Sequence, residues 1–262
     1  MFVAVAGGSS NVAATSSDGI TWTSRTLPIN QNWFSVTYGN GVFVAVAESG
    51  SAVAATSPDG VTWTAQNLPS SQNWRSVTYG NGVFVAIAYG LSGGSTVAAT
   101  SPDGITWTAQ TLPSSQQWYS VTYGNGVFVA VAYVSNVAAT SPDGITWTAH
   151  TLPSSQYWNT VTYGNGEFVA VANNTAVAAT SPDGVTWTAR TFPSSQNWWS
   201  VTYGNGEFVA VAKMTAVAAT SPDGITWTVR TLPSSQYWSS VTYGNGVFVA
   251  VVNSSAAAAT SP

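Results

Sequence analysis

Residues Val121–Thr160 read VTYGNGVFVAVAYVSNVAATSPDGITWTAHTLPSSQYWNT, and variants of these forty residues fill the chain of 262 residues. An aspartate followed by glycine marks each copy, at Asp18, Asp59, Asp103, Asp143, Asp183 and Asp223. Successive aspartates are 41, 44, 40, 40 and 40 residues apart, and such a period is typical of solenoids, propellers and other repeat architectures. The sequence therefore predicts one repeat domain over residues 1–262, with six full repeats and a partial one.

Each repeat contains four short segments with the character of β-strands, which resemble SVTYG, VFVAVA, VAATS and TWTAR. An Asn-Gly turn joins the first two segments and a PDG turn joins the last two, and both are hairpin signals. Both faces of VFVAVA are apolar, which predicts a strand that is covered on both sides. Four antiparallel strands per repeat predict the blade of a β-propeller. A β-solenoid is the alternative, but it requires parallel pairing.

The strand segments do not divide into a whole number of blades. VFVAVA and VAAT segments each occur seven times, whereas SVTYG and TWT segments each occur six times, which makes 26 strands. We expect an all-β propeller of four-stranded antiparallel blades, with seven blades of which those at the seam are incomplete. Six blades with a spare apolar hairpin are the alternative. In a third arrangement, the hairpin completes a blade of another chain by strand addition.

The composition excludes several classes of partner. Only 5% of the residues are charged, the net charge is −4, and the five basic residues are scattered along the chain. A phosphate backbone requires a clustered basic surface, so we expect no nucleic-acid partner. There is no cysteine, hence no disulfide framework. No apolar run approaches the roughly 18 residues of a membrane span, so we expect no span.

The motif SPDGITW, at Ser101–Trp107 and with close copies in the other repeats, resembles the Asp-box, or BNR, repeat of sialidase-like propellers. The family's box usually has one more residue between its aspartate and its tryptophan. The repeat sequence YGNGVFVAV…SPDGITWT is also similar to repeat tracts of bacterial surface and phage tail-associated proteins. The resemblance covers the whole chain and implies a propeller in an extracellular or virion-associated protein. It does not specify an activity, because the box occurs in proteins with many activities.

We expect the six aspartates of this motif to be structural. The serine hydroxyl and the aspartate carboxylate can accept hydrogen bonds from backbone N–H groups of the turn, and the tryptophan can cover the adjoining sheet. The aspartates lie one per blade, whereas Ca²⁺ requires about six clustered oxygens. The sequence therefore predicts no metal site and no cofactor.

The sequence also predicts that the chain is not an enzyme. The acids outside the motif are Glu48, Glu167 and Glu207, and His150 is the only histidine. Sialidase-like chemistry requires an arginine cluster, an acid and a nucleophile, and a hydrolytic triad requires a serine, a histidine and an aspartate that can approach one another. Neither set can be assembled from these residues.

Because the strands alternate in direction, the turns lie on two faces of the ring. The YGNG and PDG turns share one face and hardly vary between the copies. The opposite face, here called the variable face, carries the loops between the second and third segments and the LPSSQ links between blades. One position of each link varies most, and it holds Phe34, Arg75, Tyr119, Asn159, Trp199 and Ser239.

The candidate ligand-binding residues lie on the variable face. They are Phe34, Arg75, Tyr119, Tyr157, Trp199 and Tyr237, together with the tryptophan of each link, Trp33, Trp74, Trp118, Trp158, Trp198 and Trp238. A tryptophan beside Ser, Gln and Asn is typical of a sugar platform, but the invariance of these tryptophans among the copies favours the alternative, in which they fill gaps between blades. We expect a non-catalytic module that binds a glycan or cell-surface ligand multivalently. The alternative functions are a structural propeller that self-associates by strand exchange through its incomplete terminal blades and, third, a glycoside hydrolase.

Overall fold

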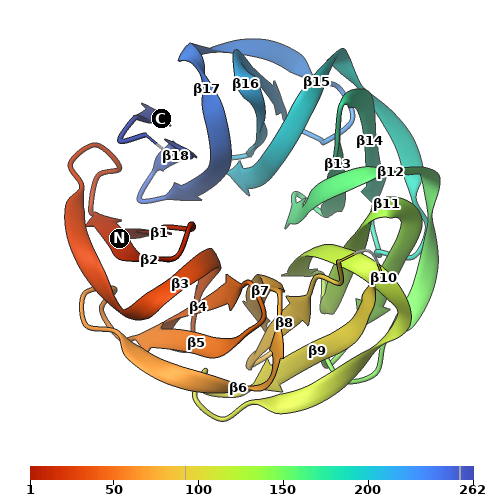
Figure 1. The fold of residues 1–262 in the computed structure, drawn as a ribbon. Helices are drawn as coiled ribbons and strands as arrows, with labels where there is room; N and C mark the ends of the chain where they lie inside the picture. Colours follow the sequence, from red (N-terminus) through yellow and green to blue (C-terminus); the bar gives the residue numbers. More distant parts are fainter. Residues whose placement is uncertain (92, 254) are drawn as a thin grey trace.

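The structure, a computed structural model, describes residues 1–91, 93–253 and 255–262 and consists of β-strands and turns. Figure 1 shows the strands arranged in groups around a common axis, as in a β-propeller. No helix occurs in the described residues, so none that could span a membrane is found there. The strands are β1 (Phe2–Val5), β2 (Ser10–Ser16), β3 (Thr23–Gly39), β4 (Val42–Glu48), β5 (Ser51–Ser57), β6 (Thr64–Gln72), β7 (Trp74–Gly80), β8 (Val83–Ala88), β9 (Ser95–Ser101), β10 (Thr108–Gly124), β11 (Val127–Ser141), β12 (Thr148–Gly164), β13 (Glu167–Asn173), β14 (Thr175–Ser181), β15 (Thr188–Gly204), β16 (Glu207–Ser221), β17 (Thr228–Gly244), β18 (Val247–Val252) and β19 (Ala258–Ser261).

Adjacent segments pair in antiparallel order through tight hairpins. At the Asn-Gly turn between β10 and β11, Asn125 and Gly126 have φ values of 48° and 80°, and positive φ at both positions is the requirement of a type I′ turn. The turn sets the register, in which Tyr123 pairs with Phe128 and Gly124 with Val127. The antiparallel pairing that the sequence predicts is therefore present, whereas the parallel pairing of a solenoid is not found among the described strands.

One feature differs from the expectation of four separate strands per repeat. The fourth segment of one blade and the first segment of the next form a single continuous strand in β3, β10, β12, β15 and β17, each 17 residues long. The beginning of β15 pairs with β14, with Thr188 opposite Thr180, and its end pairs with β16, with Tyr203 opposite Phe208. The LPSSQ link stays extended, so each of these connector strands belongs to two blades. At the second link the connector is interrupted at Asn73, between β6 and β7.

The hydrophobic core lies between neighbouring blades. In β8, Val85, Ala86 and Ile87 are fully buried, as the two apolar faces of this segment predict. Val85 and Ile87 pack with Trp118 and Trp147 of the following blade in one cluster. Clusters of the same composition recur around the ring, so each blade is stabilised mainly by the faces of its neighbours.

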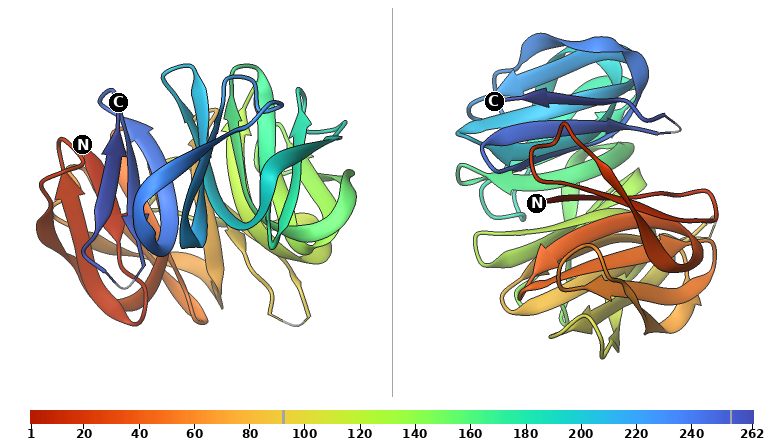
Figure 2. Two further views of the ribbon diagram at one scale, coloured as in Figure 1. Left: turned by 90° about the horizontal axis from the view of Figure 1, so that it is seen from above. Right: turned by 90° about the vertical axis from the view of Figure 1, so that its left-hand side faces the viewer.

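The groups at the two ends of the chain have three segments each. The N-terminal blade consists of β1, β2 and the first half of β3, and the C-terminal blade of the second half of β17, β18 and β19. The two blades are neighbours, and Figure 2 shows the chain ends close together. Asn245 Nδ2 donates to the carbonyl oxygen of Ser17 at 2.9 Å, as Asn165 does to Pro222 at 3.0 Å between consecutive blades.

The SxDGxTW motif forms a hydrogen-bonded turn. In Ser141–Trp147, Asp143 Oδ1 accepts from the N–H groups of Ile145 and Thr146 at 2.9 and 3.0 Å. Ser141 Oγ donates to the same carboxylate oxygen and accepts from the buried N–H of Gly144 at 2.8 Å. The hydrogen bonds from Thr146 and Ile145 lower the pKa of Asp143. Asp143 is therefore used within its own turn, like the other aspartates of the motif.

We predict that Ser141→Ala destabilises the protein more than Asp143→Ala. The serine substitution leaves the buried N–H of Gly144 without its acceptor, which costs about 1–3 kcal/mol. The aspartate substitution frees N–H groups that are exposed to water, and we expect about 1 kcal/mol or less. Chemical denaturation of both variants measures the difference. Equal stability of the wild-type protein and Ser141→Ala would contradict the structural role of the motif.

Candidate functional site

Four of the six residues at the variable link position, Phe34, Arg75, Tyr119 and Trp199, meet near the axis of the ring. Tyr119 lies on β10 and Trp199 on β15, with the blade of Asn159 between them, yet their ring centroids are only 6.2 Å apart. Asn159 Nδ2 donates to the carbonyl oxygen of Trp198 at 2.9 Å. The ring therefore gathers side chains that are forty and eighty residues apart in the sequence into one site on the variable face.

Arg75 lies at the centre of this site and is nearly buried, with 9% of its surface exposed. Its guanidinium carbon is 3.6 Å from the ring centroid of Phe34 and 3.8 Å from that of Tyr119. Its Nη1 forms an ion pair with Glu48. Burial lowers the pKa of Arg75 and Glu48 opposes this shift, so the cation is retained between two aromatic faces and beside one carboxylate.

A row of tyrosines extends from Arg75 toward the surface. Tyr119 stacks on Tyr133, with centroids 4.8 Å apart and planes at 21°. Tyr133 in turn contacts Tyr157 at 5.0 Å, and Tyr89 meets the edge of Tyr119 at 5.7 Å. Tyr157 is the exposed end of this row, with 42% of its surface accessible.

A second cation lies beside Trp199. The Nζ of Lys213 is 3.0 Å from the ring centroid of Trp199, and Lys213 pairs across the sheet with Tyr237, which is 50% exposed. Burial, and then repulsion by Arg75, lower the pKa of Lys213 to about 8. Among the described residues the only ion pair is that of Arg75 with Glu48, so no carboxylate neutralises Lys213.

We call this set the axial cluster. It consists of Phe34, Glu48, Arg75, Tyr89, Tyr119, Tyr133, Tyr157, Trp199, Lys213 and Tyr237.

Of the twelve sequence-predicted candidates, six belong to the axial cluster, Tyr157 and Tyr237 among them, and the other six are buried between blades. Phe34, Arg75, Tyr119 and Trp199 form the centre of the axial cluster. The link tryptophans are at most 1% exposed, so no ligand can stack on them, and their assignment as a sugar platform is wrong. Each donates its indole N–H to a backbone carbonyl four residues earlier and fills the space between blades. These residues are Trp33, Trp74, Trp118, Trp158, Trp198 and Trp238.

Sequence reasoning missed four of the ten members of the cluster. Glu48, Tyr89, Tyr133 and Lys213 follow the VFVAVA segment directly, at equivalent positions of four repeats. A signal was present, because this position also differs between the copies. The sequence alone does not show that this position faces the link residues, because that depends on the register of the sheet. In the structure Lys213 pairs with Asn197 and Tyr237, which places it beside the variable link residues.

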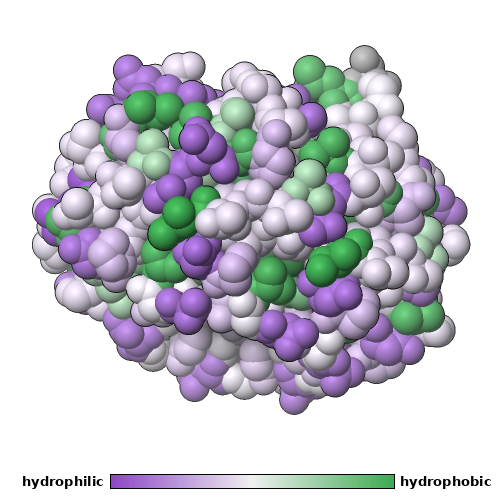
Figure 3. Space-filling view, turned by 90° about the horizontal axis from the view of Figure 1, so that it is seen from below, coloured by the Kyte–Doolittle hydropathy of each residue, from purple (hydrophilic) through white to green (hydrophobic). Residues whose placement is uncertain are grey.

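The described residues outside the axial cluster form neither a metal site nor a cluster around the single histidine. They contain no group of three His, Cys, Asp or Glu side chains that could hold a metal ion. His150 lies away from the cluster on β12, where its Nε2 is 2.8 Å from the hydroxyl of Thr140. Exposed apolar side chains outside the cluster, such as Ile105, are spread over the surface, and Figure 3 shows them on one side as small patches between hydrophilic residues.

Comparison with known proteins supports the fold. No family model and no curated protein matches the chain. Among solved structures it is similar to a streptogramin B lyase, at 11% identity and a TM-score of 0.82, over 93% of this chain and 84% of the other. It is similar to virginiamycin B lyase from Staphylococcus aureus, at 14% identity and a TM-score of 0.75, over 88% and 84%. It also resembles YCF48 bound to D1 peptide, at 17% identity and a TM-score of 0.71, over 95% and 84%.

These neighbours correct one expectation. They are β-propellers, as the sequence predicted for this chain, but they include lyases, which are enzymes. The sequence-based prediction that the chain is not an enzyme is therefore contradicted, because the same architecture supports catalysis in structurally similar proteins. At such low identity the likeness carries the fold alone.

We predict that Lys213 makes the free energy of unfolding depend on pH. The pKa of this lysine falls from an ordinary 10.5 to about 8 in the folded protein. Between these values the folded state has released a proton that the unfolded state still binds, so stability rises with pH across this window. Thermal melts of the wild-type protein and Lys213→Met between pH 7 and 10.5 isolate the contribution, since the other groups are common to both. A pH-independent difference between the two would show that Lys213 titrates normally.

Proposed function

We propose that this protein is a binding module that recognises an anionic glycan through the axial cluster. The observation that carries the proposal is the place of Lys213, which no carboxylate neutralises among the described residues: it lies over the ring of Trp199 and opposite the exposed Tyr237 on the neighbouring strand. Flat aromatic faces beside polar groups suit the apolar faces of sugar rings. A positive charge in the same place favours a sugar that carries a carboxylate.

The geometry supports one site at the axis in preference to several separate sites around the ring. The varying link residues converge on one another, with Arg75 between Phe34 and Tyr119 and with Tyr119 against Trp199. Arg75 is buried and paired with Glu48, so its role is to hold the aromatic rings in position. Lys213, Tyr157 and Tyr237 are the members that would contact the ligand.

The test is binding of the purified protein to an array that contains carboxylated glycans and their neutral counterparts. Lys213→Met should weaken binding of a carboxylated glycan by about tenfold to a hundredfold, because one charge-assisted contact of about 1.5–3 kcal/mol is lost. Tyr237→Ala should weaken binding of both kinds. Ile105→Ala, on the face of the PDG turns, is the matched control for loss of an exposed apolar side chain and should bind like the wild type.

The charge of Lys213 also predicts the pH dependence of binding. Since its pKa is about 8, the lysine loses its charge as the pH rises from 7 to 9, and affinity for the carboxylated glycan should fall over that range. Affinity that is constant over this range, or equal for charged and neutral glycans, would refute the assignment of the ligand class.

The number of blades, the Asp-box assignment and the location of the protein are also proposals. We infer a seven-bladed ring, because the C-terminal blade contacts the N-terminal blade as consecutive blades contact each other. The turn of the SxDGxTW motif supports an assignment as an Asp-box variant, in which aspartate and serine bond the turn backbone. The resemblance to surface and tail-associated repeat tracts supports an extracellular or virion-associated location.

Deletion of residues 247–262 tests the number of blades. In a seven-bladed ring this deletion removes β18 and β19, in which Phe248 and Val249 are 5% and 1% exposed. Each large apolar side chain that is buried contributes roughly 1.5–3 kcal/mol, so we expect severe loss of stability in thermal melts. A stable, monomeric truncated protein would support the six-bladed ring instead.

A further inference from the structure

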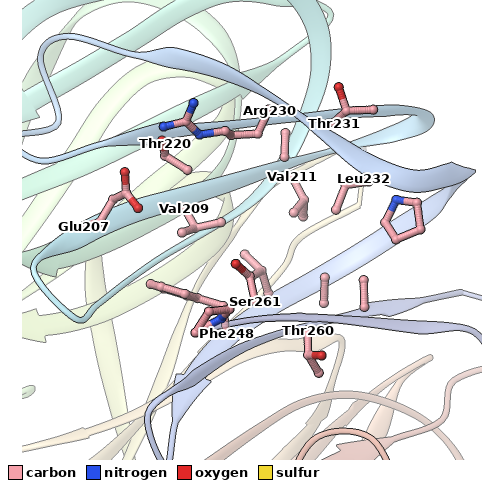
Figure 4. Close-up of a pocket in the computed structure, with 16 residues that line it drawn as sticks. Glu207, Val209, Val211, Thr220, Arg230, Thr231, Leu232, Phe248, Thr260 and Ser261 are labelled. Atoms are coloured by element: carbon pink, nitrogen blue, oxygen red, sulfur yellow. The ribbon is translucent and has the colours of Figure 1, made fainter.

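Lys213 is the only lysine of the chain, and the other four basic residues are arginines. Arg25 and Arg190 donate to threonine hydroxyls at 2.9 and 3.0 Å. Arg230 lines a cavity of about 370 Å³ between the last two blades, and Figure 4 shows its side chain there. A guanidinium group stays protonated in proteins and does not act as a nucleophile. Lys213 is therefore the single side chain that can react as an amine.

The fold does not require a lysine at this position. Lys213 directly follows the VFVAVA segment of its repeat, and the equivalent residues of other repeats carry no amine. These residues are Glu48, Tyr89, Tyr133, Asn173 and Asn253. Partial burial of an ammonium group is unfavourable, so the scaffold gains nothing from this lysine that a tyrosine or an asparagine does not also provide.

The ring over which Lys213 lies is attached firmly to the blade before it. Trp199 is the extra residue of a β-bulge, because the register of β15 against β16 shifts at this residue, and a bulge re-aims a side chain. Thr160 Oγ1 donates to the carbonyl oxygen of Trp199 at 2.7 Å, and Asn159 Nδ2 donates to the preceding carbonyl oxygen at 2.9 Å. The backbone on both sides of the bulge is thus fixed, and with it the origin of the indole.

The surroundings of the amine favour its neutral form. Its Nζ is 3.0 Å from the ring centroid of Trp199, and none of the described carboxylates pairs with it. Burial, and then the charge of Arg75, lower its pKa to about 8, so a larger fraction is neutral at pH 7 than in an ordinary lysine. A desolvated lysine beside a second cation is an arrangement that activates an amine as a nucleophile.

We propose that Lys213 forms a reversible imine with the open-chain aldehyde or ketone group of a reducing sugar that enters the axial cluster. This inference deepens the proposed function, because the choice of a sugar as the carbonyl compound rests on it. The amine lies opposite Tyr237, which is 50% exposed, so the reacting nitrogen is on the side of the cluster that solution can reach.

The step needs no oxidant, reductant or metal ion. The neutral amine of Lys213 donates its electron pair to the carbonyl carbon, the carbonyl oxygen takes up a proton, and the nitrogen releases one. The carbinolamine that results loses its hydroxyl group as water while the C=N bond forms. One carbonyl compound is consumed and one water molecule is released, and hydrolysis reverses the step.

The product suits the same surroundings as the ammonium group. The imine nitrogen can take a proton from water, and the positive charge then remains on the atom that lies over the face of Trp199. An aromatic face stabilises a cation in this place. Charge-based attraction of a carboxylated sugar and covalent capture of its carbonyl group are therefore compatible at one lysine.

The probe is glycolaldehyde, a small hydroxyaldehyde, in the presence of sodium cyanoborohydride, which reduces an imine to a stable secondary amine. Intact mass spectrometry of the folded protein measures the gain of one hydroxyethyl group, and a peptide map separates Lys213 from the amino terminus. The initial rate at Lys213 at pH 7 should exceed that of an ordinary exposed lysine at least about tenfold. At pH 10.5 this advantage should disappear, because an ordinary lysine is then largely neutral too.

The matched control is a second protein with a single lysine, the double variant that combines Lys213→Met with Ile105→Lys. Ile105 is 54% exposed on the face of the PDG turns, away from the axial cluster. The introduced lysine gives the rate of an ordinary amine on the same scaffold. Free Nα-acetyl-lysine is a second reference, which does not depend on the folding of a variant.

The outcomes separate this inference from the proposed function. Glycolaldehyde has no carboxylate, and a glycan attached to an array through its reducing end has no free carbonyl group. A failed array with rapid trapping at Lys213 therefore refutes anionic recognition and leaves the reactive amine in place. Equal rates at Lys213 and at the reference amines at pH 7, or modification of the amino terminus alone, overturn the inference whatever the array shows.

Discussion

The connector strand is the constraint on which the rest of the structure depends. Because a single extended strand such as β15 forms the outer edge of one blade and the inner edge of the next, neighbouring blades cannot change their spacing or register independently. The fixed spacing buries the VFVAVA strands on both faces and places one link tryptophan between each pair of blades. It also fixes where the variable link residue begins the inner strand, and so brings Tyr119 and Trp199 together at the axis.

The sequence predicts the local structure well because local signals determine it. The Asn-Gly turn at Asn125 requires positive φ at two positions, and both have it. The two apolar faces of Val85–Ile87 predict burial on both sides, as found. The axial cluster could not be predicted in full, because the contact of Arg75 with Glu48 depends on how far the blades are rotated about the axis. The invariance of the link tryptophans favours a spacer over a platform in sequence, and the packing of Trp118 and its counterparts establishes it.

The charge distribution separates the scaffold from the axial cluster. The repeats use neutral hydrogen-bonding residues almost everywhere, and only 5% of the chain is charged. Against this background the cluster combines Arg75, Glu48 and Lys213 with a row of aromatic rings. Holding two cations near each other in a partly buried place is unfavourable, as the lowered pKa of Lys213 indicates. Residues that are costly for folding and that differ in type between equivalent positions of the repeats are candidates for function.

The junction of the first and last blades has a consequence for how the chain folds. The asparagine bond between blades spans 57 residues from Asn165 to Pro222 but 228 residues from Asn245 to Ser17. Closing the longer loop costs about 1.2 kcal/mol more in chain entropy, and among the described residues no connector strand joins these two blades. We therefore expect contacts within a blade and between consecutive blades to form before the contact between the first and last blades. The junction of the first and last blades is therefore the contact between neighbouring blades that we expect to separate most readily.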